Sequence, residues 1–307
     1  MSANCCIFSG QGAQVPGMGK DFAEDSAIAS LFTRANEVLG FDLAKICFEG
    51  PAEELTKSNI CQPAIFVVST AAYQTFKKRF PDVTFSMAAG LSLGEWSALH
   101  AAGVLDFDST LKVLEARGRF MQEACEAQPS GMVSIMGATA EQLQALCEKS
   151  GCGISNLNTA AQTVLSGTKD QVAACEAAAK EAGIKAIVLS VAGAFHSKFM
   201  MPAREKLAAV LDEITFKAPQ MPVLANVSGT FHSSDPAAIK DAMLRQVTES
   251  VHWLDCMQTA IKEGASEMVE FGPGGVLARM MKRIDKSVPA RAIADLASIE
   301  AYVPHAE

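Results

Sequence analysis

The chain has 307 residues, of which 49% are hydrophobic and 20% are charged, so it can bury a large core and divide into two units. Its 34 acidic and 26 basic residues give a formal net charge of −8, which argues against nucleic acid as a partner. No apolar run approaches the roughly 20 residues that cross a bilayer, and no signal peptide is evident, so we expect a cytoplasmic protein that binds no membrane. Nine scattered cysteines without a C-x-x-C pair favour reduced thiols over disulfides or a zinc site.

The first 130 residues have the pattern of an α/β lobe. Strands are predicted at 5–8 and 83–89, and helices at 22–38, 62–80, 93–102 and 109–126. A loop with several glycines follows the first strand, at 9–19. It has no Lys-Ser or Lys-Thr pair after its glycines and no G-x-G-x-x-G pattern, which excludes the usual phosphate-binding loops.

The most informative stretch of this lobe is 89–96, where a short apolar strand changes into a helix and a serine stands at the change. Ser92 lies between Gly90 and Gly94, as in a nucleophile elbow. The glycines remove side chains that would collide with the neighbouring strand and helix, so the serine can occupy a strained turn. Its hydroxyl would project at a helix N-terminus, where free N–H groups favour a developing oxyanion. The alternative is a chance match in a loop.

A serine hydroxyl needs a base to become a nucleophile, and five histidines are available. His100 stands about two helical turns beyond Ser92, roughly 12 Å along the axis and out of reach. We expect His232 in a surface loop and His305 in the tail. His196 differs because it closes an apolar strand that ends in small residues. Such a histidine is often structural, but together with Ser92 it becomes the best candidate for the base.

From 132 onward the pattern becomes strand, helix, two strands, helix and strand, the order of a ferredoxin-like unit. The later segments of this unit are predicted at 140–149, 154–158, 163–166, 169–182 and 185–191. Helices at 201–214, 237–248, 254–262 and 275–284 and strands at 223–226 and 268–271 then return to the main lobe. The sequence therefore predicts an α/β-hydrolase-like main domain with a parallel sheet, formed by 1–130 and 192–307, and a smaller ferredoxin-like α+β insert at 131–191. The active site is expected in the cleft between them.

Five short motifs occur in order along the chain, at 9–14, 90–95, 117–122, 193–197 and 270–274. Together they resemble the malonyl-CoA:acyl carrier protein transacylase family, the acyltransferases of bacterial-type fatty acid synthesis. The resemblance covers essentially the whole chain, and five spaced motifs are far more specific than any one of them. It implies transfer of a malonyl group from malonyl-CoA to the phosphopantetheine thiol of acyl carrier protein, without a metal or a further cofactor.

Carried over by position, the resemblance implies Ser92 as the nucleophile, His196 as the base and Arg117 as the partner of the malonyl carboxylate. It also implies the backbone amides of Gln11 and Leu93 as the oxyanion hole.

In this family a backbone carbonyl, not an aspartate, orients the histidine, and we place that carbonyl at His252 within 250–253. Further substrate contacts are expected from Asn158 and Gln162, which lie in a segment similar to an Asn-rich strand of the family. The chain departs from the family at Leu91, where many members have a histidine. A leucine cannot act as a base, so any mechanism that uses a histidine beside the serine is in doubt.

The position of the Arg117 side chain indicates which acyl group the site would accept. Charged residues scatter around the predicted helix 109–126, so by pattern alone the arginine is either a solvated surface charge or an inward clamp. An inward guanidinium pairs with a carboxylate through two hydrogen bonds, and its burial disfavours uncharged acyl groups. With the resemblance, the clamp is favoured. Met121 and Phe195 are then either walls around the acyl group or ordinary core residues.

Other functions would use the same residues. A serine thioesterase or hydrolase would share Ser92 and His196 but let water resolve the acyl-enzyme, although no acid is evident in the order serine, acid, histidine. A non-catalytic binding module would keep only the fold, and a trans-acting acyltransferase of polyketide synthesis would serve a different carrier. An acidic carrier needs a local basic surface on this acidic protein. The candidates for that surface or for the phosphates of CoA are Lys185, Lys198, Arg204, Arg279, Lys282, Arg283 and Lys286.

Overall fold

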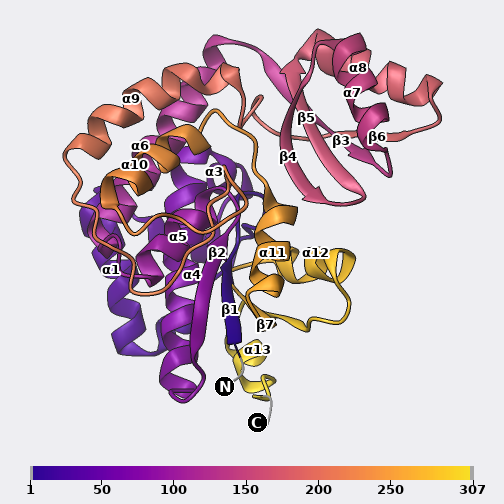
Figure 1. Cartoon of the computed structure of the whole chain (residues 1–307). Helices are drawn as coiled ribbons and strands as arrows, with labels where there is room; N and C mark the ends of the chain where they lie inside the picture. The colour runs from indigo at the N-terminus through magenta and orange to yellow at the C-terminus, as the bar shows by residue number, and fades with distance from the viewer. Residues whose placement is uncertain (1–2, 305–307) are drawn as a thin grey trace.

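The computed structural model describes residues 3–304 and contains two β-sheets (Figure 1). The larger sheet is parallel, with the strand order β2-β1-β7-β8. Its strands are β1 (Ala3–Phe8), β2 (Phe85–Gly90), β7 (Ala265–Phe271) and β8 (Ala290–Ile293). The strand expected at 223–226 is reduced to isolated bridges, in which Val223 pairs with Ala88 and Leu224 with Phe231.

Helices cover both faces of the larger sheet, and alternate residues of β1 supply the two cores. Cys6 and Phe8 pack in the core that includes α4 (Ser58–Arg79) and α5 (Leu93–Ala101). Cys5 and Ile7 pack on the other face with α11 (Trp253–Lys262) and α12 (Val276–Ile284). A strand that is buried on both faces appears in the sequence as an unbroken apolar run, and 5–8 is such a run.

The larger body contains further helices besides α4, α5, α11 and α12. They are η1 (Phe22–Glu24), α1 (Ser26–Leu39), α2 (Leu43–Glu49), α3 (Ala52–Thr56), α6 (Phe107–Ala127), η2 (Lys198–Met200), α9 (Met201–Asp212), α10 (Pro236–Gln246) and α13 (Leu296–Glu300). α6 packs along α4 and carries α9 on its other side. α6 is thereby held between α4 and α9.

The smaller sheet is antiparallel, with the strand order β4-β5-β3-β6. Its strands are β3 (Ser130–Met136), β4 (Gly153–Thr159), β5 (Gln162–Thr168) and β6 (Lys185–Val188). α7 (Ala140–Ser150) and α8 (Lys169–Glu181) cover one face and enclose a core of their own around Val133 and Leu165. The other face of the sheet is directed toward the larger body.

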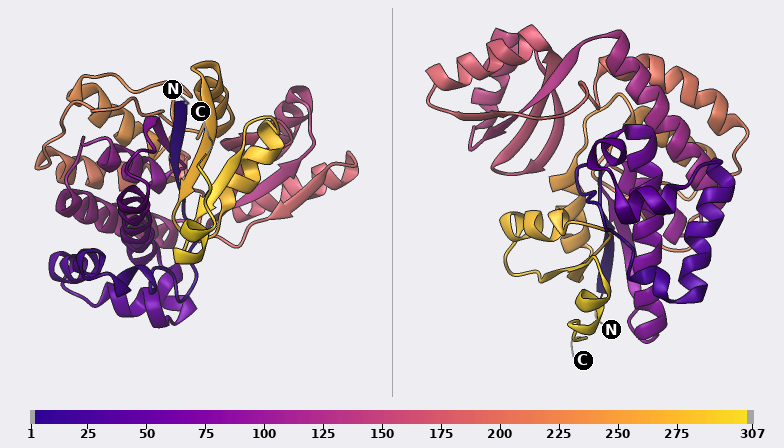
Figure 2. Two further views of the ribbon diagram at one scale, coloured as in Figure 1. Left: turned by 90° about the horizontal axis from the view of Figure 1, so that it is seen from below. Right: turned by 180° about the vertical axis from the view of Figure 1, so that it is seen from behind.

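The smaller sheet stands at one end of the larger body, and the two ends of the described chain lie together at the opposite end (Figures 1 and 2). β1 starts near the N-terminal label and runs toward the smaller sheet. Because the larger sheet is parallel, the carboxyl ends of all its strands face that side. Ligands bind at the carboxyl ends of the strands in open α/β sheets, so this arrangement already marks the candidate site.

The sequence predicted a parallel sheet and further strands outside it, and the parallel sheet and a separate antiparallel sheet are both confirmed. It missed α2, α3, β8 and α13, which are all short. It also placed the end of β6 at 191, whereas the strand ends at Val188. Ile187 and Val188 on this edge strand and Val191 just beyond it are exposed, so their apolar character does not reflect burial.

Two expectations from composition can be compared with the described residues. All nine cysteines are free thiols, and eight of them are buried. Within 3–304, no helix is long and apolar enough to cross a membrane. His305, expected in the tail, lies outside the described residues.

Candidate active site

Ser92 occupies a strained turn between β2 and α5. Its φ of 56° and ψ of −108° lie in a region that residues other than glycine rarely adopt. The flanking glycines are required for this geometry. A Cβ on Gly90 would lie 1.9 Å from the carbonyl oxygen of Gly94, and a Cβ on Gly94 would lie 2.2 Å from that of Phe8. The predicted role of the two glycines is therefore confirmed.

Asn226 holds the turn from the side. Its Oδ1 accepts a hydrogen bond from the Ser92 backbone N–H at 2.7 Å, and its Nδ2 donates to the Gly90 carbonyl at 2.8 Å. The Asn226 side chain is fully buried, and both of its polar ends are used. Strained backbone persists only where neighbours over-determine it, and Asn226 supplies that constraint here. The sequence analysis missed this residue, which lies 134 positions from Ser92.

His196 lies beside Ser92, as predicted. Its Nε2 is 2.8 Å from the Ser92 Oγ, and its Nδ1 is 2.7 Å from the Gln246 carbonyl oxygen. A carbonyl can only accept, so Nδ1 carries the proton and Nε2 presents its lone pair to the serine. Burial, together with the positive charge of Arg117, lowers the pKa of His196 from its ordinary value to about 4. The imidazole is therefore neutral at physiological pH, the state that a general base requires.

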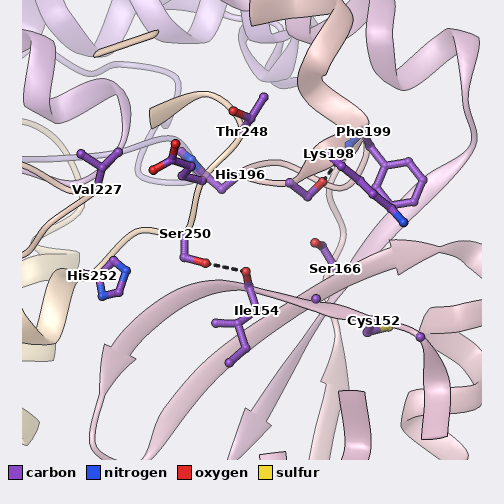
Figure 3. A pocket seen from close by; sticks show the side chains of 14 residues that line it. Cys152, Ile154, Ser166, His196, Lys198, Phe199, Val227, Thr248, Ser250 and His252 are labelled. Atoms are coloured by element: carbon purple, nitrogen blue, oxygen red, sulfur yellow. Dashed lines mark hydrogen bonds between the residues drawn. The ribbon is translucent and has the colours of Figure 1, made fainter. Parts of the chain in front are cut away.

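The carbonyl that orients His196 belongs to Gln246, so the prediction of His252 was wrong. Figure 3 shows the His252 ring apart from His196, and its Nδ1 pairs with the Asp255 carboxylate at 3.0 Å. In the same segment, the Ser250 hydroxyl donates to the Ile154 carbonyl of β4 (Figure 3). The segment 250–253 therefore joins the larger body to the smaller sheet. Ser250 and His252 line a second cavity of about 510 Å³ that does not include Ser92.

Arg117 points inward from α6, and its side chain is 1% exposed. The guanidinium donates to the Ser92 Oγ at 3.0 Å, to the Gln62 Oε1 at 2.7 Å and to the Gln246 Oε1 at 3.1 Å. Burial lowers the pKa of Arg117 to about 10, which still leaves it charged at neutral pH, and the carboxylate of Glu95 opposes this shift. Its Nε is buried without a hydrogen-bond partner. A buried cation beside the nucleophile with an unused donor fits an anionic group on the substrate.

Gln246 ties these groups together, and the sequence analysis missed it. Its backbone carbonyl orients His196, and its side-chain oxygen accepts from Arg117. Its Nε2 donates to the Ser92 carbonyl at 2.9 Å and to the Glu95 Oε2 at 2.6 Å. One residue at the end of α10 therefore contacts the nucleophile, the base and the arginine. A main-chain acceptor leaves no signature in a sequence, which explains why it was not found.

Glu95 anchors this network from the first turn of α5. Its Oε1 lies 2.6 Å from the His232 Nε2, and its Oε2 also accepts from the Asn226 backbone N–H at 3.3 Å. Both side chains of this hydrogen-bonded pair are 1% exposed. The expected surface position of His232 was therefore wrong, because its side chain turns inward although the residues after it are exposed. A carboxylate inside the predicted elbow was the signal that could have indicated a buried partner.

Most of the other predicted site residues line one cavity of about 550 Å³ that contains Ser92 and His196. Gln11, Met121, Phe195, Asn158 and Gln162 all belong to its lining. Met121 and Phe195 are also part of the larger core, so each is at once a core residue and a wall of the cavity. The Asn158 Oδ1 is buried and unpartnered, whereas the Gln162 Nε2 donates to the Ser134 hydroxyl at 3.1 Å.

The remaining predicted residue, Leu93, is fully buried at the first position of α5. The first N–H groups of a helix have no partner within it, so the Leu93 N–H remains available next to Ser92. His100 is explained without catalysis, because its Nδ1 lies 3.0 Å from the Leu105 carbonyl and its ring packs on Phe66.

This arrangement can carry out nucleophilic acyl transfer. The hydroxyl, a neutral base oriented by a carbonyl, a helix N-terminus and a cation all meet at the carboxyl end of β2. Within 3–304, no three His, Cys, Asp or Glu side chains are grouped so that they could hold a metal ion.

Comparisons with known proteins point the same way. The model of the acyl transferase domain family matches residues 5–304. The malonyl CoA-acyl carrier protein transacylase of Bacillus subtilis is 39% identical to the chain and covers 98% of it, with 96% of the relative matched. The crystal structure of the protein of that name from Clostridium perfringens superposes with a TM-score of 0.93 at 34% identity, covering 98% of this chain and 96% of that one.

A further solved structure shows a type II polyketide synthase acyl carrier protein in complex with its malonyl-transacylase. It matches with a TM-score of 0.93 at 36% identity and covers 98% of each chain.

Proposed function

Because the chain belongs to the acyl transferase domain family, we propose that it transfers a malonyl group from CoA to the phosphopantetheine thiol of an acyl carrier protein in fatty acid synthesis. The observation that carries this conclusion is the contact of Arg117 with Ser92 at 3.0 Å, while His196 contacts the same oxygen at 2.8 Å. A nucleophile and base alone would fit many acyl groups. The buried guanidinium adds a requirement for a negative charge on the acyl group, which malonyl supplies.

The first half-reaction forms a malonyl-serine. His196 Nε2 takes the Ser92 hydroxyl proton while Oγ attacks the thioester carbonyl, and the resulting oxyanion is held by the backbone N–H groups of Gln11 and Leu93. The carbon–sulfur bond then breaks, and the CoA thiolate takes the proton from His196. Arg117 holds the malonyl carboxylate through donors such as its unused Nε–H.

The second half-reaction reverses these roles. The carrier thiol gives its proton to His196, and its sulfur attacks the ester carbonyl of the malonyl-serine. The carbon–Oγ bond breaks, and Ser92 regains its proton from the imidazole. Asn158 and Gln162 contact the substrate from the smaller sheet, with Met121 and Phe195 as walls. The exchange is a ping-pong reaction that balances without a metal or cofactor, so malonyl-CoA and the carrier are its only partners.

The proposal extends to the finer description of the fold and to its location. The strand order β4-β5-β3-β6 supports a ferredoxin-like insert at 131–191. The parallel sheet with its serine elbow supports an α/β-hydrolase-like main domain formed by 1–130 and 192–307. A cytoplasmic location fits partners that act in fatty acid synthesis.

Mass spectrometry of the intact protein tests the function. On brief exposure to malonyl-CoA the protein should gain one malonyl group on the peptide that contains Ser92, and the holo-carrier should then remove it as malonyl-carrier. Ser92→Ala should gain no malonyl group. Release of free malonate at the same rate with and without the carrier would instead identify a thioesterase. Failure to gain any mass would indicate a non-catalytic module. Parallel assays with a fatty acid carrier and a polyketide carrier would show which one is served.

A further inference from the structure

The cavity that contains Ser92 has a distinctive charge. Among its described lining residues, the only formally charged side chains are Arg279 and Arg283, and no carboxylate faces it. The whole protein, by contrast, carries a net charge of −8. The charge of the cavity lining is therefore opposite in sign to that of the whole protein, and the cavity will attract anions.

Both arginines come from one face of α12. The cavity lining includes Val276, Arg279, Met280 and Arg283, which follow each other at helical spacing. The two arginines are one turn apart, so their guanidinium groups can approach a single anionic group together. In Figure 1, α12 lies beside α11 on the side of the larger body that faces the smaller sheet. It also approaches β4.

Neither arginine is committed to an acidic partner. The Arg279 Nη1 donates to the Gly274 carbonyl at 2.7 Å, which fixes its guanidinium near the start of α12. The carboxylate of Glu270 interacts electrostatically with Arg279, but it is buried and accepts hydrogen bonds from the Ser9 hydroxyl and the Ala278 backbone N–H. Both arginines are exposed and form no ion pair within 3–304.

The substrate of the proposed function determines which anion these residues meet. The malonyl carboxylate is assigned to Arg117, which is buried beneath Ser92. The pantetheine arm that follows the thioester is neutral. The next negative charge is the phosphate at the far end of that arm, and CoA and the holo-carrier share it.

We infer that Arg279 and Arg283 form a binding site for the phosphate that ends the pantetheine arm. The inference rests on the proposed function and adds a second anchoring point for its substrates. Because donor and acceptor carry the same phosphate, one site holds both arms in the same position relative to Ser92. The malonyl-bearing thioester and the attacking thiol then reach the same point in turn.

The test compares donors that differ only at the phosphate: malonyl-pantetheine, malonyl-phosphopantetheine and malonyl-CoA. The variants are Arg279→Met, Arg283→Met and the double variant. Lys262→Met is the matched control, because Lys262 is an exposed cation on the neighbouring helix α11 that does not line the cavity. The rate of malonyl-enzyme formation is measured without carrier. Each arginine substitution should lower kcat/KM about tenfold for the two donors with a phosphate and leave the value for malonyl-pantetheine unchanged, and Lys262→Met should change none of the three values.

A second experiment measures the rate of malonyl transfer to the acceptor thiol. Malonyl-enzyme of each variant is prepared with malonyl-pantetheine and is then discharged with the holo-carrier or with free pantetheine. The double variant should react more slowly with the carrier only. Equal losses for donors with and without a phosphate, no loss for any donor, or a loss confined to the carrier would each overturn the inference. If wild-type protein were not malonylated by any donor, the proposed function itself would fail, which is a separate outcome.

Discussion

The guanidinium of Arg117 donates to the hydroxyl of Ser92 at 3.0 Å, so the group that we propose to bind the malonyl carboxylate touches the nucleophile directly. The carboxylate of a malonyl group on Ser92 is only a few bonds from the serine oxygen. It can therefore meet the same guanidinium without a movement of α6. Arg117 and His196 therefore both contact the Ser92 Oγ, so a change at Arg117 should alter the choice of acyl group.

Arg117→Ala should change the choice of acyl group. Loss of the guanidinium removes the partner of the malonyl carboxylate and the cost of leaving a buried cation unpaired when the acyl group is neutral. The ratio of kcat/KM for acetyl-CoA to that for malonyl-CoA should rise roughly a hundredfold. Arg119→Ala is the control, since Arg119 is exposed on the same helix and pairs with Glu115. Unchanged selectivity in the Arg117 variant would refute the clamp.

The pH dependence of malonylation should report the buried state of His196. The base must be neutral to accept a proton, and burial together with Arg117 lowers its pKa to about 4. The value of kcat/KM for malonyl-CoA should therefore stay level as the pH falls through 6.5 and decline only near 4. Arg117→Met removes the positive charge, so the acidic limb should move to higher pH even though activity is lower. A limb near 6.5 in the wild type would contradict the assignment.

The same pKa shift predicts a loss of stability in acid. Between pH 6.5 and about 4 the histidine of the unfolded chain binds a proton while His196 in the folded protein does not. The unfolded state then holds more protons, so stability falls as the pH is lowered through this window, by about 3 kcal/mol for this residue. Urea unfolding at several pH values, with His196→Gln for comparison, measures this contribution. The variant should show a weaker pH dependence over the window.

The glycines of the serine turn should tolerate no side chain. Gly90→Ala and Gly94→Ala each place a Cβ within 2.2 Å of a backbone oxygen, and backbone cannot move aside as a flexible side chain can. We expect losses of several kcal/mol or failure to fold. Gly153→Ala is the matched control, because its added Cβ would meet nothing within 4 Å. Thermal unfolding of the three variants is sufficient, and near-equal melting temperatures would show that the turn relaxes easily.

Glu95 should contribute to both stability and rate. Glu95→Ala leaves His232 and the Gln246 amide without their buried acceptor, which should cost roughly 3–5 kcal/mol and lower kcat as Gln246 loosens. Glu95→Gln keeps one carbonyl oxygen and should lose much less. Glu123→Ala, which breaks only exposed ion pairs, should change the free energy of unfolding by about 1 kcal/mol or less. Urea unfolding and malonylation rates check these values. Equal effects of the alanine and glutamine substitutions would argue against a specific role for the carboxylate.

The parts of the site that carry a local signature could be predicted from the sequence. Ser92 stands where the periodicity changes from strand to helix between two glycines, and His196 ends an apolar run. Gln246 has no such signature, because its backbone oxygen is chemically the same as any other and only the tertiary fold brings it to His196. His252 was chosen from the segment that follows in the chain, and the difference of six positions spans the turn after α10.

The helices and strands also differ in how far the local sequence reveals them. Long segments rich in helix-forming residues, such as α4 and α6, were found close to their observed bounds. Short ones such as α3 and β8 bury little surface of their own and depend on neighbours that the sequence does not reveal. Ile187 and Val188 show a different error. Their apolar side chains suggested a buried strand, but they are exposed at an open sheet edge.

The acceptor for His196 comes from residue 246, near the end of α10, whereas the serine and the histidine are made much earlier. A nascent chain released from the ribosome only as far as residue 240 would contain both reactive side chains but could not align them. Truncation before residue 246 should therefore remove the group that orients the base without removing either reactive side chain.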